Sequence, residues 1–364
     1  MRGIVAAVVV LLALAAAAAW WWTRPPRASA AELQQALRLA PAQADGAVAV
    51  AEPSRAGRFL ARRPQAILLL AAAAGPATEA LASLRPTALA LGAAARGPLV
   101  LWWQGGEGAV AARLEPAARG AFLEVAARGS AVATCGGDWC AVATVAELLP
   151  RDEEPADAAV ASSGALAALG RVGGRLWEVR ARERWVEASA GTAPPCPTPR
   201  PDRSAVALPE AGALLAQLGV RGVPVGPVRL AADDGNEWAV AFPRLRLEGL
   251  ARRLLGGPPA GTPEPSLWRG LAGAIWVSER DGTALASSPA ALALLPDTGA
   301  DASQGVIHGR HAAWLLSRAA SLAGRIPGLP LRQRDLTRAA ALAQEIDAVS
   351  FRVEAGGGRI VLTW

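Results

Sequence analysis

Two of the three cysteines lie close together, in the stretch VATCGGDWCAVAT of residues 132–144. A thiol pair at this spacing could form a disulfide, bind a metal ion or exchange electrons. Four residues separate them, Gly-Gly-Asp-Trp, and the Gly-Gly-Asp part favours a tight turn, which would place Cys135 and Cys140 opposite each other across a hairpin. Opposed Cα atoms lie about 4.5–5.5 Å apart there, a separation that a disulfide accepts. We therefore predict a Cys135–Cys140 disulfide.

Two other outcomes stay open for this pair. The thiols could stay reduced, or they could serve a metal or redox site. A metal would need two further ligands, and redox motifs more often have the spacing C-x-x-C. A disulfide would place the domain outside the cytosol, where such bonds persist. The role of the third cysteine, Cys196, is left open.

The chain contains two histidines, both in the segment VIHGRH of residues 306–311. A histidine pair can begin a metal site or supply a general base. No carboxylate or cysteine follows His308 and His311 at ligand spacing, so we expect a loop or helix-start role. An enzyme would require these histidines, or Asp138, to meet other polar side chains in a cleft. Asp138 lies beside glycine, which is typical of a turn.

Sequence signatures of common catalytic sites are absent from the chain. It holds no G-x-S-x-G nucleophile elbow, no P-loop and no G-x-G-x-x-G dinucleotide motif. The glycine-rich stretch of residues 105–108 lacks the lysine and the following helix that phosphate binding needs. We therefore expect no catalytic residue, no metal and no cofactor.

The basic charge of the chain does not indicate a nucleic-acid-binding protein. All 37 basic residues are arginine, and the net charge is +6. The arginines are interspersed with acidic residues, whereas nucleic-acid-binding proteins gather basic side chains into a patch or stripe. Nucleic acid is therefore not an expected partner.

The N-terminus carries an apolar run that predicts a transmembrane helix from Ile4 to Trp22. Its length matches the roughly 20 residues that cross a bilayer, and tryptophans at its end favour the membrane–water boundary. A signal peptide cut after Ala30 is the alternative, although the Trp triplet and two prolines favour an uncleaved anchor. The flanking arginines are nearly balanced, so they fix the orientation weakly.

Parts of the chain resemble one another. Three pairs of segments align: 114–123 with 247–256, 131–144 with 274–287, and 45–63 with 304–320. In the second pair Cys135 matches Ser278 and Cys140 matches Thr283, so the turn itself does not depend on a thiol. Asp138 matches Asp281. Short apolar runs split by Gly, Asp and Asn predict hairpins in both halves.

These patterns predict an α+β fold of two related halves of antiparallel hairpins, with helices packed on one face, after one transmembrane helix. The expected boundaries divide the chain into four parts: an anchor and short linker at 1–30, a first repeat at 31–190, a proline-rich linker at 191–203, and a second repeat at 204–364.

Several tryptophans could either pack in the core or line an apolar groove. Trp102 and Trp103 are adjacent, so in a strand they would face opposite sides of the sheet. Core packing is the expected role of such side chains. An apolar groove is the alternative, and its candidate residues are Trp102, Trp103, Trp139, Trp276 and Trp314.

The stretch PAQADGAVAV of residues 41–50, after an anchor and a short helix, resembles the start of the soluble part in bacterial single-span membrane-anchored proteins. This resemblance implies the inner membrane as the location, with the soluble domain outside the cytoplasm, and implies no activity. We expect a non-catalytic interaction or scaffold protein of the cell envelope, with the membrane and an envelope protein as partners. The alternative is a binder of apolar ligand or lipid in a groove between the two repeats.

Overall fold

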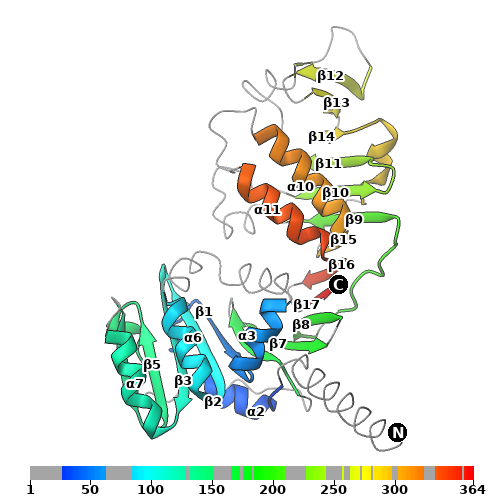
Figure 1. Cartoon of the computed structure of the whole chain (residues 1–364). Coiled ribbons are helices and arrows are strands. Elements are labelled where there is room, and N and C mark those ends of the chain that lie inside the picture. Colours follow the sequence, from blue (N-terminus) through cyan, green and yellow to red (C-terminus); the bar gives the residue numbers. More distant parts are fainter. Residues whose placement is uncertain are drawn as a thin grey trace, which may run out of the picture. The chain divides into compact units, whose positions relative to one another are not determined.

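The computed structural model divides into two compact units, Met1–Ala188 and Ser189–Trp364, which are described separately. The residues that the structure describes are 27–62, 84–127, 131–150, 165–172, 175–182, 184–192, 194–209, 227–242, 256–257, 263–270, 273–279, 282–296, 302–323, 333–354 and 356–364. They form 17 strands, and each strand pairing given below is antiparallel (Figure 1).

The first unit is built on a ladder of strands in the order β6-β1-β2-β3-β5-β4, with β7 next to β6. The bounds are β1 Gly46–Val50, β2 Ala95–Gln104, β3 Glu107–Leu114, β4 Val132–Gly136, β5 Trp139–Ala143, β6 Ala168–Val172, β7 Arg175–Arg182 and β8 Trp185–Gly191. Alternating residues of β1, β2 and β3 are buried on both faces, so helices cover both sides of this sheet.

The helices of the first unit divide between the two faces. They are α2 Ala30–Leu37, α3 Pro53–Arg62, α6 Arg85–Ala94, α7 Pro116–Ala127 and the short 3₁₀ turn η2 Ala146–Leu148. Helix α2 and η2 share a core with Ala47, Ala49 and Trp102. Helices α6 and α7 share a core with Val110 and Val142 on the opposite face. Helix α2 begins at Ser29, whose hydroxyl accepts from the Glu32 N–H in a capping box.

The second unit has its strands in the order β16-β15-β9-β10-β11-β14-β13-β12, with β17 next to β16. The bounds are β9 Arg203–Leu208, β10 Val228–Asp233, β11 Trp238–Phe242, β12 Ser266–Gly270, β13 Gly273–Ser278, β14 Thr283–Ala286, β15 Ser303–His308, β16 Ala348–Glu354 and β17 Gly357–Thr363. Helices α10 Gly309–Ala323 and α11 Gln333–Gln344 pack side by side (Figure 1). A 3₁₀ turn, η3 Ala290–Leu294, follows β14 as η2 follows β5.

Six strands follow the same order in both units. In the first unit this order is β6-β1-β2-β3-β5-β4, and in the second it is β15-β9-β10-β11-β14-β13. Strand β9 therefore holds the position of β1, because each pairs with the first strand of the following hairpin and with a later strand. The sequence alignment instead matched β1 with β15, which is the counterpart of β6.

The expected fold class, an α+β fold with helices on one face, is wrong. The described residues are 28% helical and 46% strand, so the protein is mostly antiparallel sheet. In the first unit the helices also cover both faces, because alternate residues of β2 and β3 are apolar on either side. The hairpin signals were interpreted correctly, but the strands β6–β9 were missed.

The expected transmembrane helix, from Ile4 to Trp22, lies outside the described residues. Among the residues that the structure describes, no helix combines the length and the apolar character that crossing a membrane requires.

Candidate functional site

The second unit contains a hydrogen-bonded chain of serine, histidine and aspartate. The Ser204 Oγ atom lies 2.8 Å from Nδ1 of His311, and Nε2 of His311 lies 2.8 Å from Oδ1 of Asp234. Strand β9 supplies the serine, the first turn of α10 the histidine, and the β10–β11 turn the aspartate. These three residue types also form the catalytic triad of many hydrolases, so the arrangement is tested here as a candidate active site.

The directions of the hydrogen bonds follow from the partners. The Asp234 carboxylate accepts, so Nε2 of His311 carries the proton and Nδ1 accepts from the Ser204 hydroxyl. The Ser204 Oγ atom in turn accepts from the backbone N–H of His308, at 2.9 Å. The second histidine is also engaged, because Nε2 of His308 lies 2.6 Å from the Arg200 carbonyl oxygen. Both histidines therefore tie the start of α10 to neighbouring segments.

This network is closed to a substrate. Ser204 is 0% exposed and His311 is 5% exposed, so no external carbonyl can approach the hydroxyl. The serine also faces Nδ1 of the imidazole and the aspartate Nε2, which reverses the usual arrangement of a triad. The network satisfies buried polar groups at the junction of β9, α10 and the β10–β11 turn, which is a structural role.

Asp234 forms the solvent-facing end of the network. Its hydrogen bond from His311, helped by the charge of Arg310, holds the pKa of this carboxyl below its usual range. Arg310 forms an ion pair with Asp234 at 2.8 Å. Because the folded state lowers this pKa, the contribution to stability is present above the unfolded pKa and is lost as the pH falls through the folded pKa.

We predict that replacing Ser204 with alanine destabilises the protein without removing an activity. The change leaves Nδ1 of His311 and the His308 N–H without their partner in a buried site, which costs about 1–3 kcal/mol. Urea unfolding followed by circular dichroism measures the loss. A fluorophosphonate probe, which labels activated serines, serves as the control on the unmodified protein. Labelling that disappears in the variant would contradict the structural role.

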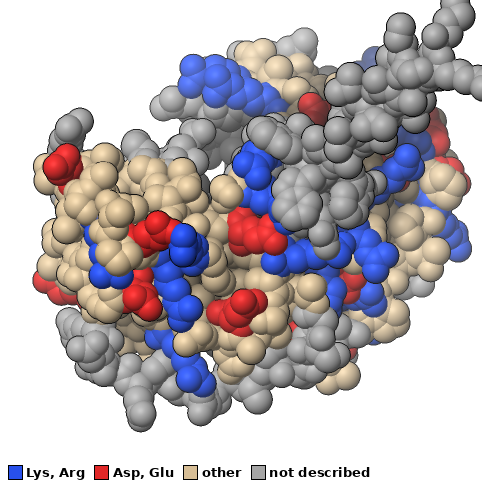
Figure 2. Space-filling model, turned by 60° about the horizontal axis from the view of Figure 1, so that its bottom comes forward, with Lys and Arg blue, Asp and Glu red and all other residues tan. Residues whose placement is uncertain are grey.

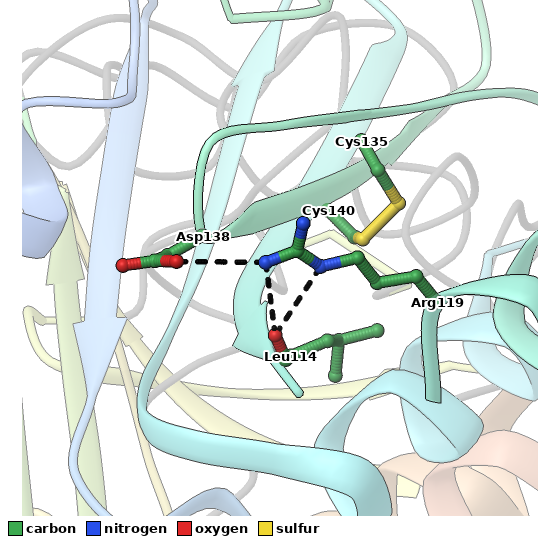
Figure 3. The surroundings of a disulfide bond; sticks show 5 residues. All are labelled: Leu114, Arg119, Cys135, Asp138 and Cys140. Atoms are coloured by element: carbon green, nitrogen blue, oxygen red, sulfur yellow. Dashed lines mark hydrogen bonds and ion pairs between the residues drawn. A yellow bond between two sulfur atoms is a disulfide. The ribbon is translucent and has the colours of Figure 1, made fainter. Parts of the chain in front are cut away.

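The predicted disulfide is present in the structure. Cys135 and Cys140 are directly opposed in the β4–β5 ladder, with Cα atoms 4.1 Å apart. Figure 3 shows the guanidinium of Arg119 reaching across from α7 to the Leu114 carbonyl and to Asp138 at the tip of the hairpin. Asp138 is 84% exposed, so this ion pair contributes little. Asp138 therefore lies in a turn, and its sequence counterpart, Asp281, lies outside the described residues.

The third cysteine lies inside the second unit. Its Sγ atom lies 3.7 Å from the Ser350 carbonyl oxygen and 3.5 Å from that of Arg359. Cys196 is thus a thiol that donates to the backbone of β16 and β17. The described residues hold no cluster of three or more His, Cys, Asp and Glu side chains that could bind a metal ion.

The tryptophans chosen from the sequence fall into separate cores. Trp102 and Trp103 are 0% and 5% exposed, and they lie in different clusters on opposite faces of the first unit. Trp139 packs at the margin of the Trp102 cluster. In the second unit, Trp276 packs beside Ala239 and Ala286, and Trp314 stacks under the Arg318 guanidinium. An apolar groove built from these five residues stays a prediction.

A cavity of about 630 Å³ lies in the second unit, and no sequence pattern predicted it. Alanines of β9 and residues of β15 form part of its wall, with arginines and prolines at other points. The residues that line it are Pro197, Thr198, Arg200, Arg203, Ala205, Ala207, Pro296, Gln304, Gly305 and Val306. These side chains offer apolar contact and positive charge, and the described lining residues include no Ser, Cys, His, Lys, Asp or Glu.

Surface charge is mixed. On the face drawn in Figure 2, arginine side chains lie between acidic ones among the described residues.

Comparison with protein-family models, curated proteins and solved structures finds no match for this chain. The functional conclusion therefore depends on the cavity and the network alone.

Proposed function

We propose that this chain is a non-catalytic interaction or scaffold protein of the cell envelope. The observation that carries the proposal is the cavity of the second unit, whose described lining residues offer apolar contact and positive charge to a partner but no Ser, Cys, His, Lys, Asp or Glu. In the one constellation of catalytic residue types among the described residues, Ser204–His311–Asp234, the serine and histidine are buried and hydrogen-bonded, and the exposed Asp234 is held by His311 and Arg310.

Two features support a location outside the cytoplasm. The Cys135–Cys140 disulfide belongs to an oxidising compartment. The apolar residues from Ile4 to Trp22 have the composition of a single-pass membrane attachment. We therefore infer a protein held at the inner membrane, with both units outside the cytoplasm.

A second candidate function is binding of an apolar ligand or lipid. A cavity of about 630 Å³ falls in the range of ligand pockets, about 300–1,000 Å³. Its arginines would then hold an anionic headgroup or carboxylate.

The test is mild crosslinking in native membranes, followed by purification on a C-terminal tag and identification of what co-purifies. A reproducible envelope protein supports the scaffold function. A protein that carries only lipid would replace it with the second candidate. Turnover of a hydrolase substrate that is lost in Ser204→Ala would overturn both.

The disulfide yields its own prediction. In a double variant, Cys135→Ser with Cys140→Thr, each cysteine is replaced by the residue at the aligned position of the second repeat. These aligned residues are Ser278 and Thr283. The double variant should keep the hairpin and lose about 2 kcal/mol of stability, the loop-closure value for so short a loop. Urea unfolding with and without dithiothreitol measures this loss.

The double variant also supplies the control, because its stability should not respond to the reductant. Wild-type protein should lose the same amount when reduced. If both cysteines are freely alkylated in native membranes, the disulfide and the inferred compartment are both refuted.

A further inference from the structure

Helix α2 fills one face of the first unit. Its Leu33, Ala36 and Leu37 are buried against alanines of β1 and against Trp102. The helix packs on three strands, β1, β2 and β6. The Trp102 ring completes the surface under the helix, and its Nε1 donates to the Leu148 carbonyl of η2 at 2.9 Å.

The second unit has the same strands in the same order, β9, β10 and β15. In β1, Ala47 pairs with Trp102 and Ala49 pairs with Leu169. At the same positions in β9, Ala205 pairs with Ala231 and Ala207 pairs with Gln304. Alanine thus stands where the first unit has a buried tryptophan, and glutamine stands where it has a leucine.

Part of this face is hollow; Gln304 lines the hollow, whereas Ala231 is 0% exposed and is not among its described lining residues. Paired residues of an antiparallel ladder point to the same face, so Ala205, Ala207, Val306 and Gln304 share the face that corresponds to the one under α2. Ala205, Ala207, Val306 and Gln304 line the cavity. Among the described residues of the second unit, the 3₁₀ turn η3 covers this face over β10, β11 and β14, as η2 does in the first unit, and no α-helix takes the place of α2 over Ala205 and Ala207.

The charge of the cavity differs from that of the face under α2. Arg200 and Arg203 line it, and none of the described lining residues is acidic. Arg203 donates to the Leu294 carbonyl of η3, as Trp102 donates to Leu148 of η2. Its Nε atom is buried and has no hydrogen-bond partner among the described residues. Arg229, opposite Ala207 in the ladder, has the same unpaired Nε. The positively charged wall of the cavity therefore favours a carboxylate on the segment that covers it.

We propose that this cavity docks a short amphipathic helix of a partner protein, in the position that α2 holds in the first unit. The helix presents leucine or alanine at spacings of three and four residues, as Leu33, Ala36 and Leu37 do, and places an Asp or Glu against Arg200 and Arg203. This inference rests on the proposed function and names the chemistry of its partner.

The test uses the full chain and a synthetic peptide of residues 28–41, which contains α2, acetylated, amidated and labelled with a fluorophore. Saturable binding by fluorescence anisotropy is expected, and unlabelled peptide should compete. Peptide with Leu33→Asp and Leu37→Asp is the matched control and should not bind. Failure of the parent peptide to bind the full chain overturns the inference.

Variants of the full chain locate the binding site. Ala207→Trp fills the cavity and should weaken peptide binding at least about tenfold, a loss of roughly 1.4 kcal/mol. Arg200→Gln removes an exposed charge and should weaken binding about threefold at low salt, with less effect at high salt. Unchanged binding to Ala207→Trp would show that the peptide binds elsewhere, for example by exchanging with α2, and would also overturn the inference.

The outcomes separate this inference from the proposed function. An envelope protein recovered by crosslinking, with no peptide binding, removes the helix-docking site and leaves the scaffold function standing. Displacement of bound peptide by vesicles of phosphatidylglycerol, but not of phosphatidylcholine alone, would show that the cavity takes an anionic lipid and overturns the protein partner.

Discussion

Replacing Trp102 with alanine should lower the free energy of unfolding by about 3–5 kcal/mol, the usual cost of removing a buried aromatic ring. Trp102 is 0% exposed and lies between α2 and the alanines of β1 and β3. Its loss leaves a void under the helix, and the Leu148 carbonyl loses its donor. Urea unfolding of the full chain, followed by far-ultraviolet circular dichroism, measures the effect.

Trp102→Phe separates the two parts of this effect. Phenylalanine keeps most of the ring volume but cannot donate to Leu148, so the expected loss is about 1–3 kcal/mol. Trp103→Phe is a matched control, because Trp103 lies on the other face of the sheet and its indole takes no part in the α2 contact. A loss below about 1 kcal/mol in Trp102→Ala would show that α2 does not depend on this ring.

The hairpins could be predicted from the sequence because their signals are local. Glycine, aspartate and asparagine between short apolar runs identified β2–β3, β4–β5, β10–β11, β13–β14 and β16–β17. The cysteine spacing likewise predicted the disulfide, since the partners lie on either side of one turn. Each of these features is decided within about a dozen residues.

The strands β6 to β9 could not be predicted in the same way. β6 follows an alanine-rich segment and β9 a proline-rich one, and β7, RLWEVRAR, has charged residues on both faces and no face that is apolar throughout. β9 begins directly after the proline-rich segment, at the predicted start of the second repeat, where no hairpin signal indicates a strand. Its identity depends on pairing with β10 and β15, which lie far along the chain.

The candidate site could not be predicted from the sequence for the same reason, because its residues lie far apart along the chain. The sequence singled out His308 and His311, but their partner Ser204 lies 107 positions from His311. Asp234 lies in a short Asp/Gly/Asn turn of a kind typical of hairpins, and only the folded chain brings its carboxylate to His311. The cavity lies beside Ala205 and Ala207, and only the strand register shows that these alanines match Ala47 and Ala49 under α2 in the first unit.

The central claim is that this face is filled by α2 over Ala47 and Ala49 in the first unit and is hollow over Ala205 and Ala207 in the second. The most direct measurement compares the unfolding free energies of two matched variants, Ala49→Trp and Ala207→Trp. Ala49 is 0% exposed beneath α2, so a tryptophan there overpacks the core and should cost roughly 3 kcal/mol.

Ala207 lines the cavity, so its new ring has room to pack. We predict a change of less than about 1 kcal/mol, in either direction, because the added apolar contact offsets the cost of ordering the side chain. Equal and large losses in the two variants would contradict the central claim, because they would show that the second face is as fully packed as the first.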